Sequence, residues 1–230
     1  MTQKFAAIIL AAGKGTRMKS ALPKVLHEIA GRPMLGHAMA AAAEAGASEV
    51  LLVTAPDQDA VRDYADAQGI KTTHCIQKEQ LGTGDAVRAA FEATDKHQRF
   101  VVMFGDTPLM RTQVLQELAG NNADVTVLAF EPEDAAAYGR VVMQGDTPTA
   151  IIEFKDADNA TRAISLCNGG AMGLSRAALE NYLPQLSNDN AQGEYYLPDF
   201  VALAHGGGDS TALVMAEAED TIGVDSRAGQ

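Results

Sequence analysis

Four cations gather in one glycine-containing stretch near the start of the chain. The stretch LAAGKGTRMKSALPK (10–24) contains no acidic residue and holds Lys14, Arg17, Lys19 and Lys24. Gly13 and Gly15 lack a side chain, so the backbone there can approach a ligand closely. Because the whole chain has a formal net charge of -12, this local excess of positive charge predicts a site for a small phosphorylated ligand. The alternative is a solvated basic loop.

A second candidate is a carboxylate that ends an apolar segment. RFVVMFGD (99–106) reads as a buried strand that ends in a glycine and Asp106. Open α/β sheets bind ligands beyond the carboxyl ends of their strands, so Asp106 is placed where a ligand would lie. The alternative is that Asp106 caps the helix expected to begin within TPLMRTQVL (107–115).

Two further motifs have both a functional and a structural interpretation. QLGTG (80–84) is a tight glycine turn before a helix that starts near Asp85. It could offer backbone groups to a flat base, or it could be a plain turn in which Thr83 is the N-cap. GEYYLPD (193–199) places two tyrosines beside Glu194. They could form a pocket wall, or they could pack the entrance of a helix.

The alternation of apolar runs with helix-patterned segments predicts the elements that position these residues. In the first half we expect strands at 5–10, 49–55, 71–77 and 99–106, and helices at 34–46, 58–69 and 83–94. Nearly continuous apolar strands in β-α-β order predict an α/β fold, with a Rossmann-like, mostly parallel sheet and helices on both faces. Gly46 and Gly69 stand where helix C-caps are expected.

The second half of the chain departs from this alternation. GRVVMQGDTPTAIIEFK (139–155) predicts an antiparallel hairpin that turns at QGDTP (144–148), inserted over one edge of the sheet. Around the hairpin we expect helices at 112–120, at 176–186 and starting within 195–207, and strands at 124–130, 165–175 and 211–218.

Composition excludes several classes of protein. The chain has 230 residues, of which 47% are hydrophobic and 21% charged, as in one globular domain or one and a half. The net negative charge argues against a nucleic-acid or anionic-membrane partner, and no apolar run reaches the ~18 residues of a membrane span. Cys75 and Cys167 form no disulfide framework or metal motif. Because the sequence contains neither a membrane span nor a disulfide framework, we expect a cytoplasmic protein. The five histidines suggest no catalytic pair, and we expect them to be structural or at the surface.

Eight motifs along the chain carry a family resemblance. LAAGKGTRM and LPKVLHEIAG are followed in order by QKEQLGTGDAV, GDTPL, YGRVV, IIEFKDA, NAQGEYYLPD and GVDSR. Together they resemble the sugar-1-phosphate nucleotidylyltransferases, and within them the bacterial enzymes that act on N-acetylglucosamine 1-phosphate. The resemblance covers essentially all 230 residues. It implies the nucleotide-diphospho-sugar transferase type of the fold predicted above.

The resemblance implies an activity and the residues that perform it. UTP and N-acetylglucosamine 1-phosphate would give UDP-N-acetylglucosamine and pyrophosphate, a precursor step of peptidoglycan synthesis. Arg17 and Lys24 would be catalytic, and Asp106 and Asp225 would bind Mg2+. The family more usually has asparagine at the second metal position. The residues implied to bind the nucleotide are Leu10, Ala11, Ala12, Gly13, Gln77, Gly82 and Thr83.

The sugar half of the expected site contains two departures from the family pattern. Gly139, Glu153 and Asn168 are implied to bind the sugar. This chain has Gly169 where the family commonly has threonine, and Phe104 where it often has tyrosine. Two alternatives therefore stay open: a nucleotidyltransferase for another sugar 1-phosphate or nucleotide, and a non-catalytic regulator that binds nucleotide sugars.

The domain organisation expected from the resemblance is a single nucleotidyltransferase domain over 1–230. Residues 1–110 would form its nucleotide-binding half and 111–230 its sugar-binding half. In bifunctional members a β-helix acetyltransferase domain of hexapeptide repeats follows, and we expect none within these residues.

Overall fold

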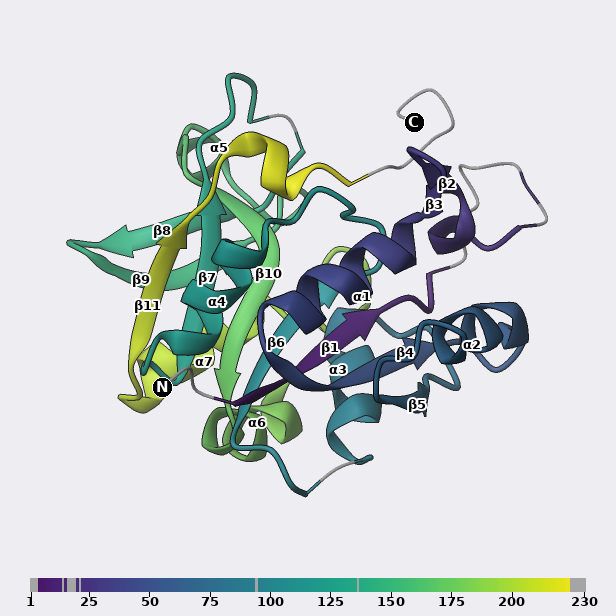
Figure 1. Cartoon of the computed structure of the whole chain (residues 1–230). Helices are drawn as coiled ribbons and strands as arrows, with labels where there is room; N and C mark the ends of the chain where they lie inside the picture. The colour runs from purple at the N-terminus through teal and green to yellow at the C-terminus, as the bar shows by residue number, and fades with distance from the viewer. Residues whose placement is uncertain are drawn as a thin grey trace.

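A computed structural model of the chain describes residues 4–13, 15, 20, 22–93, 95–135 and 137–223. Among these residues one mixed sheet runs through the molecule, with main strands in the order β11-β7-β10-β6-β1-β4-β5 (Figure 1). These strands are β1 (Phe5–Leu10), β4 (Ala47–Thr54), β5 (Thr72–Ile76), β6 (Arg99–Phe104), β7 (Val125–Phe130), β10 (Cys167–Ser175) and β11 (Thr211–Met215). Their pairings are parallel except those of β10, which runs antiparallel to β6 and β7. The predicted mostly parallel sheet is confirmed.

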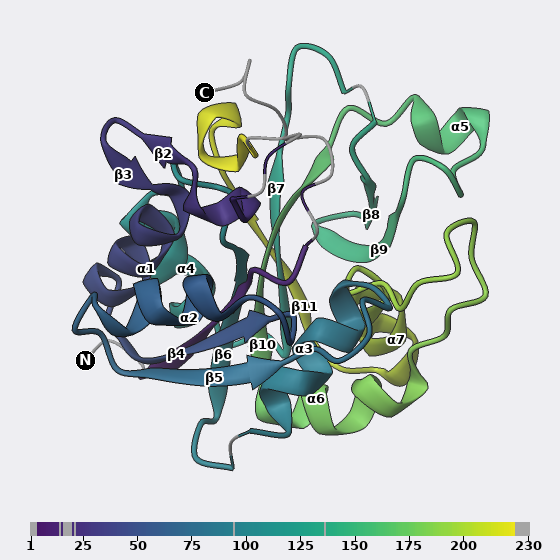
Figure 2. The same ribbon diagram turned by 90° about the vertical axis from the view of Figure 1, so that its right-hand side faces the viewer.

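Helices cover both faces of the sheet. Figure 2 shows α1, α2 and α4 on one side and α3, α6 and α7 on the other. The first group is α1 (Met34–Glu44), α2 (Asp59–Asp66) and α4 (Thr112–Gly120), and the second is α3 (Thr83–Phe91), α6 (Arg176–Tyr182) and α7 (Asp199–Gly207). Gly46 (φ +97°) and Gly69 (φ +68°) follow α1 and α2 in the left-handed region, which agrees with their predicted place at helix ends.

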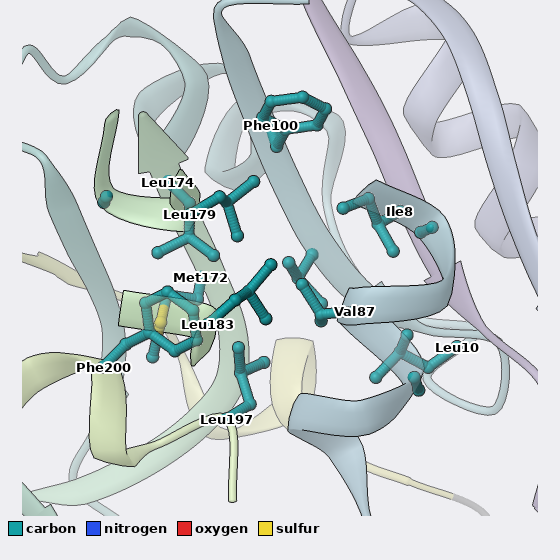
Figure 3. Packing of buried hydrophobic residues seen from close by; sticks show 14 of the residues in the cluster. Ile8, Leu10, Val87, Phe100, Met172, Leu174, Leu179, Leu183, Leu197 and Phe200 are labelled. Atoms are coloured by element: carbon teal, nitrogen blue, oxygen red, sulfur yellow. The ribbon is translucent and has the colours of Figure 1, made fainter. Parts of the chain in front are cut away.

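Two hydrophobic layers explain why the strands are almost entirely apolar. In β1 all six side chains are buried, because successive residues point to opposite faces and both faces are covered. Ile8 and Leu10 pack with Val87 of α3, Leu179 of α6 and Phe200 of α7 (Figure 3). Residues 5, 7 and 9 pack instead against α1, α2 and α4.

The predicted hairpin consists of β8 (Arg140–Gln144) and β9 (Thr147–Ile152). Its first residue, Arg140, pairs with Cys167 at the start of β10, whereas β6 pairs with the later part of β10, Met172–Ser175. The hairpin therefore pairs with the part of β10 that lies beyond the carboxyl end of β6. Near its turn, the carbonyl of Pro148 accepts a hydrogen bond of 2.7 Å from Thr211 of edge strand β11. It thus reaches the expected edge while it is joined to an interior strand.

Shorter elements complete the described part of the chain. They are the 3-10 turns η2 (Lys24–Leu26), η3 (Leu183–Gln185) and η4 (Ala218–Thr221), the small hairpin of β2 (Glu28–Ile29) and β3 (Arg32–Pro33), and helix α5 (Asn159–Arg162). In this part no helix has the length and apolar character needed to cross a membrane.

A buried carboxylate joins three segments at the start of β4. Glu49 accepts hydrogen bonds from Thr73 (2.6 Å), His97 (2.9 Å) and Lys71 (3.0 Å). Burial raises the pKa of Glu49, but these three donors outweigh it and lower the pKa to about 2. His97 is therefore part of a structural cluster, as expected for the histidines.

We expect Glu49→Gln to lower the free energy of unfolding by about 2 kcal/mol at pH 7. The folded pKa of about 2 lies below the reference value of 4.5. The ionised carboxylate therefore stabilises the fold fully above pH 4.5, and this contribution disappears as the pH falls towards 2. Urea denaturation at pH 7, 4 and 2.5 measures the effect. A difference between the two proteins that did not shrink with pH would contradict it.

Candidate active site

A cavity of about 220 Å³ opens beyond the carboxyl ends of β1 and β6. The loop after β1 is held between its neighbours, since Ala11 N–H donates to the Val53 carbonyl (2.9 Å) and Gly105 N–H donates to the Leu10 carbonyl (3.0 Å). All seven residues expected to bind the nucleotide line this cavity, and we name it the nucleotide cavity after that expectation. Its full lining is Leu10, Ala11, Ala12, Gly13, Lys24, Val25, Gln77, Gln80, Gly82, Thr83, Ala86, Phe104, Asp106 and Glu194.

The QLGTG turn forms one wall of the nucleotide cavity. Gly82 has φ +111°, and a Cβ there would lie 2.6 Å from the Tyr195 carbonyl oxygen, so the position requires glycine. The buried Gln77 side chain donates from Nε2 to the Gly82 carbonyl (3.0 Å) and to Asp85 Oδ2 (2.9 Å). The amide of Gln77 is thereby fixed in orientation.

The GEYYLPD segment is bound to this turn. Tyr195 N–H donates to the Leu81 carbonyl (2.8 Å), and Gly84 N–H donates to the Tyr195 carbonyl (2.8 Å). Thr83 does not act as the N-cap of α3, because Gly82 holds that position. Instead Thr83 Oγ1 accepts a hydrogen bond from Leu197 N–H (2.9 Å). Both interpretations of the tyrosines hold in part: Tyr196 lines a cavity, whereas Tyr195 packs beneath Arg88.

A lysine–aspartate ion pair lies on the wall of the nucleotide cavity. Lys24 belongs to η2 and Asp106 follows β6. Lys24 Nζ lies 2.6 Å from Asp106 Oδ2, with the two side chains 13% and 24% exposed. The fold therefore brings together one expected catalytic cation and one expected metal ligand. Three other residues of the predicted site, Lys14, Arg17 and Asp225, lie outside the described residues.

A second cavity has a volume of about 180 Å³ and shares Thr83, Phe104 and Glu194 with the first. We name it the sugar cavity because Glu153 and Asn168, two of the residues expected to bind the sugar, line it. Its other lining residues are Glu153, Asn168, Gly170, Met172, Gln192, Tyr196, Leu197 and Pro198. Gly139 does not line it but lies behind Glu153: a Cβ on Gly139 would be 3.1 Å from Glu153 Oε1. The Gly139 carbonyl also accepts from Asn168 N–H (2.9 Å).

Burial controls the electrostatics of the sugar cavity. It raises the pKa of Glu153, and the nearby carboxylates of Asp156 and Asp199 raise it further. Burial, again with Asp156, raises the pKa of Asp199 to about 6. Ionised Glu153 is therefore costly in the unliganded protein. Hydroxyl donors from a ligand would offset that cost.

The two departures from the family pattern, Gly169 and Phe104, lie at different places relative to the sugar cavity. A Cβ on Gly169 would meet Leu128 and Thr221, each at 3.0 Å, and Gly169 does not line the sugar cavity. Phe104 lines both cavities, and its ring would lie 3.0 Å from a Cβ on Gly170. Of the two positions, only Phe104 can change what a ligand meets directly.

The structure adds site residues that reasoning from the sequence missed. Gln80 Nε2 donates to the Ala12 carbonyl (2.6 Å), which links the QLGTG turn to the loop after β1. Gln80 lies in the QLGTG motif and Glu194 in the GEYYLPD motif, but a glutamine or glutamate at these positions did not by itself indicate a contact with a ligand. Both cysteines are buried and unpaired. Among the described residues no group of three histidine, cysteine, aspartate or glutamate side chains could hold a metal.

The family model for the MobA-like NTP transferase domain matches residues 7–193. The chain therefore belongs to this family of nucleotidyltransferases. Two solved structures share the fold: the inositol-1-phosphate CTP transferase from T. maritima (TM-score 0.77, 17% identity, 98% of this chain and 91% of that one) and a UDP-glucose pyrophosphorylase complexed with UDP-glucose (TM-score 0.75, 19%, 93% and 90%). The nucleotide-diphospho-sugar transferase fold is confirmed.

Among curated proteins, the chain is similar to the bifunctional protein GlmU of several bacteria. It is 46% identical to GlmU of Parvibaculum lavamentivorans over 226 residues, which covers 96% of this chain and 50% of the relative. It is also 46% identical to GlmU of Rhizorhabdus wittichii over 231 residues, which covers 97% of this chain and 51% of the relative. The chain thus spans about half the length of these relatives.

Proposed function

We propose that this chain is a uridylyltransferase that makes UDP-N-acetylglucosamine and pyrophosphate from UTP and N-acetylglucosamine 1-phosphate. One observation carries the proposal: two adjoining cavities share a wall, and Lys24 and Asp106 lie on the cavity lined by the nucleotide motifs. The motif resemblance and the GlmU relatives support this choice of substrates. The halves 1–110 and 111–230, the peptidoglycan role and the cytoplasmic location stay predictions.

The base would be selected by the fixed amide of Gln77. With Nε2 bonded to Gly82 and Asp85, Gln77 has its Oε1 acceptor to offer to a ligand. Uracil carries a hydrogen on N3, whereas cytosine has an acceptor there. The arrangement therefore favours UTP over CTP, with the Leu10–Gly13 backbone and Gly82 bounding the base.

A magnesium ion would be held at Asp106 together with the substrate phosphates. Mg2+ prefers oxygen ligands and is commonly held by one or two carboxylates together with substrate phosphates. Asp106 supplies one carboxylate beside the nucleotide cavity, and Asp225 would supply the second. Bound there, the ion would withdraw negative charge from the reacting phosphates.

The reaction needs no nucleophile from the protein. An ionised phosphate oxygen of the sugar 1-phosphate attacks the α-phosphorus of UTP, one P–O bond forms, and the bond to the leaving pyrophosphate breaks. The chain's contribution is to align the two substrates and to offset charge. Lys24 and Arg17 would neutralise the phosphates, while Glu153 and Asn168 would hold the sugar in the second cavity.

A pyrophosphate-release assay tests the proposal. Purified protein with Mg2+ is offered UTP, CTP or dTTP in combination with N-acetylglucosamine 1-phosphate, glucose 1-phosphate or inositol 1-phosphate. We expect the highest kcat/KM, by at least about tenfold, for UTP with N-acetylglucosamine 1-phosphate. Preference for another pair would overturn the substrate choice. Release from none of them, with nucleotide sugar still bound, would indicate the non-catalytic regulator.

Lys24→Met should strengthen the binding of Mn2+ to the protein without nucleotide several-fold, although it weakens catalysis. The Lys24 ammonium neutralises Asp106 at 2.6 Å, so an arriving metal ion must displace it; a partly exposed pair of this kind contributes about 1 kcal/mol. Electron paramagnetic resonance of unbound Mn2+ measures the affinity. Unchanged or weaker binding in the variant would show that Lys24 does not compete with the metal at Asp106.

Glu153→Gln should raise the KM for the sugar 1-phosphate about tenfold or more, because a hydrogen bond to a charged group is replaced by a neutral one. The same change should slightly raise the free energy of unfolding at pH 8. Since the folded pKa of Glu153 is raised, ionisation above that pKa costs stability, and glutamine removes the cost. Steady-state kinetics and urea denaturation at pH 8 test both effects. A variant that was destabilised with an unchanged KM would assign Glu153 a packing role.

A further inference from the structure

We propose that Asp85 determines the base specificity of the nucleotide cavity, although it lies behind Gln77 and does not line that cavity. This inference rests on the proposed function, in which the amide of Gln77 meets the base. Asp85 and Gln77 both line a neighbouring cavity of about 390 Å³. Because Asp85 acts through Gln77 and does not touch the nucleotide, we describe it as a positioning residue.

The two partners of the Gln77 amide nitrogen are both acceptors, so they favour one orientation of the amide. Gln77 Nε2 donates to the Gly82 carbonyl (3.0 Å) and to Asp85 Oδ2 (2.9 Å). An amide turned by 180° would place Oε1 against a carbonyl and a carboxylate, with no hydrogen to share. A hydrogen bond to a carboxylate is stronger than one to a neutral carbonyl. Asp85 therefore contributes the larger part of the preference.

The rest of Gln77 has little freedom to move. Its side chain is buried, with the residue only 4% exposed, and its backbone N–H donates to the Thr54 carbonyl (2.9 Å). The terminal torsion of a glutamine is broad and nearly two-fold. Without partners of fixed polarity, the amide would populate both orientations. Control of this one torsion is therefore what Asp85 adds to a side chain that packing already holds in place.

Arg88 holds the carboxylate of Asp85 from the other side. Asp85 Oδ1 lies 3.6 Å from Arg88 Nη1, three residues further along α3. Arg88 is itself anchored, because its Nη2 donates to the Leu183 carbonyl (3.1 Å) and its guanidinium lies over the ring of Tyr195, 5.1 Å from the centroid. One oxygen of Asp85 thus bonds the amide that meets the base, and the other faces an arginine that does not line the nucleotide cavity.

The consequence for the ligand concerns the poor base more than the good one. With Nε2 held by Gly82 and Asp85, the Oε1 acceptor of Gln77 suits the N3–H of uracil and repels the N3 lone pair of cytosine. An amide released from Asp85 can turn and donate Nε2 to cytosine, while uracil still binds the original orientation. Loss of Asp85 should therefore raise the affinity for CTP relative to that for UTP.

Calorimetric titration with UTP and with CTP, without sugar 1-phosphate, tests the inference without relying on turnover. Asp85→Asn places an amide that can accept from Gln77 in one orientation and donate to it in the other. We expect it to lower the ratio of UTP affinity to CTP affinity about tenfold. Asp85→Glu keeps the charge and should retain most of the preference. In a Gln77→Ala background, Asp85→Asn should leave the ratio unchanged, because the amide that it orients is gone.

Asp59→Asn serves as the matched control. Asp59 also lies in the first turn of a helix, α2, and pairs with an arginine three residues on, Arg62, so the ratio should stay as in the wild type. A wild-type protein that binds UTP and CTP equally would overturn the base choice in the proposed function and this inference with it.

A wild-type preference for UTP that Asp85→Asn retains in full would overturn the role of Asp85 alone. Equal losses of affinity for the two nucleotides would also overturn it, because they would assign Asp85 to the stability of α3. Should Asp85→Asn fail to fold, Asp85→Leu, which is similar in size and offers no acceptor, decides by the same ratio.

Discussion

Asp106→Ala is expected to lower kcat by about 10³-fold or more, with the fold intact. A bound metal ion supplies several kcal/mol of charge stabilisation to a transferring phosphate, and each 1.36 kcal/mol corresponds to about tenfold in rate. Asp106 lines the nucleotide cavity, and its Oδ2 lies 2.6 Å from Lys24 Nζ. Pyrophosphate release over a range of Mg2+ concentrations measures the loss. Excess Mg2+ should not restore the rate.

Asp225→Asn should have a smaller effect than Asp106→Ala. An amide oxygen still binds Mg2+, but one negative charge is removed. We therefore expect a working enzyme that needs a higher Mg2+ concentration for half of its maximal activity. If Asp106→Ala retained most of its turnover, Asp106 would not hold the metal ion. If Asp225→Asn left the Mg2+ dependence unchanged, Asp225 would not be a ligand.

Arg17→Ala is expected to lower kcat by about 10²–10³-fold while the affinity for UTP changes little. Its proposed role is to offset the negative charge that builds up as the phosphoryl group is transferred, and this charge is absent from bound UTP. Steady-state kinetics and equilibrium binding of UTP separate the two quantities. Arg17 lies outside the described residues, so the expectation rests on its motif and on the cavity that the neighbouring Leu10–Gly13 segment lines.

Lys19→Ala is the matched control for Arg17→Ala. Lys19 belongs to the same basic stretch and has no proposed role in the reaction, so its loss should change kcat by less than about threefold. Equal losses in the two variants would mean that the general positive charge of the stretch matters and that Arg17 has no special position. Loss of UTP binding with kcat retained in Arg17→Ala would assign it to ground-state binding.

Local patterns in the sequence predicted much of the fold. Apolar runs of strand length that alternate with amphipathic segments can bury their side chains only in a sheet covered on both faces, and that sheet is present. The ends of those strands indicated where a ligand would lie, and the nucleotide cavity opens there. Glycines at 46, 69 and 82 occupy backbone conformations that side chains disfavour, so they too could be interpreted locally.

The hairpin and Thr83 show where local patterns were insufficient. The turn and its two strands were predictable, because hairpin formation depends on neighbours in the chain. The hairpin pairs with the first residue of β10, whereas β6 pairs only with the later part of that strand. This choice of partner depends on the order of strands in the whole sheet, which the hairpin sequence does not contain. Likewise, a threonine at the start of a helix suggests an N-cap, yet the oxygen of Thr83 accepts from Leu197 in another segment.

The order of the main elements, the strand ends at the candidate site and the types of side chain there could all be predicted from sequence patterns. The partners of those side chains became known only from the fold: Gln80 bonds Ala12, 68 residues away, Arg111 bonds Asp220, 109 away, and Thr83 bonds Leu197, 114 away. Periodicity and capping report interactions within a few residues. Contacts at these separations depend on how the crossovers and β10 bring distant loops to one edge of the sheet, and no local pattern encodes that packing.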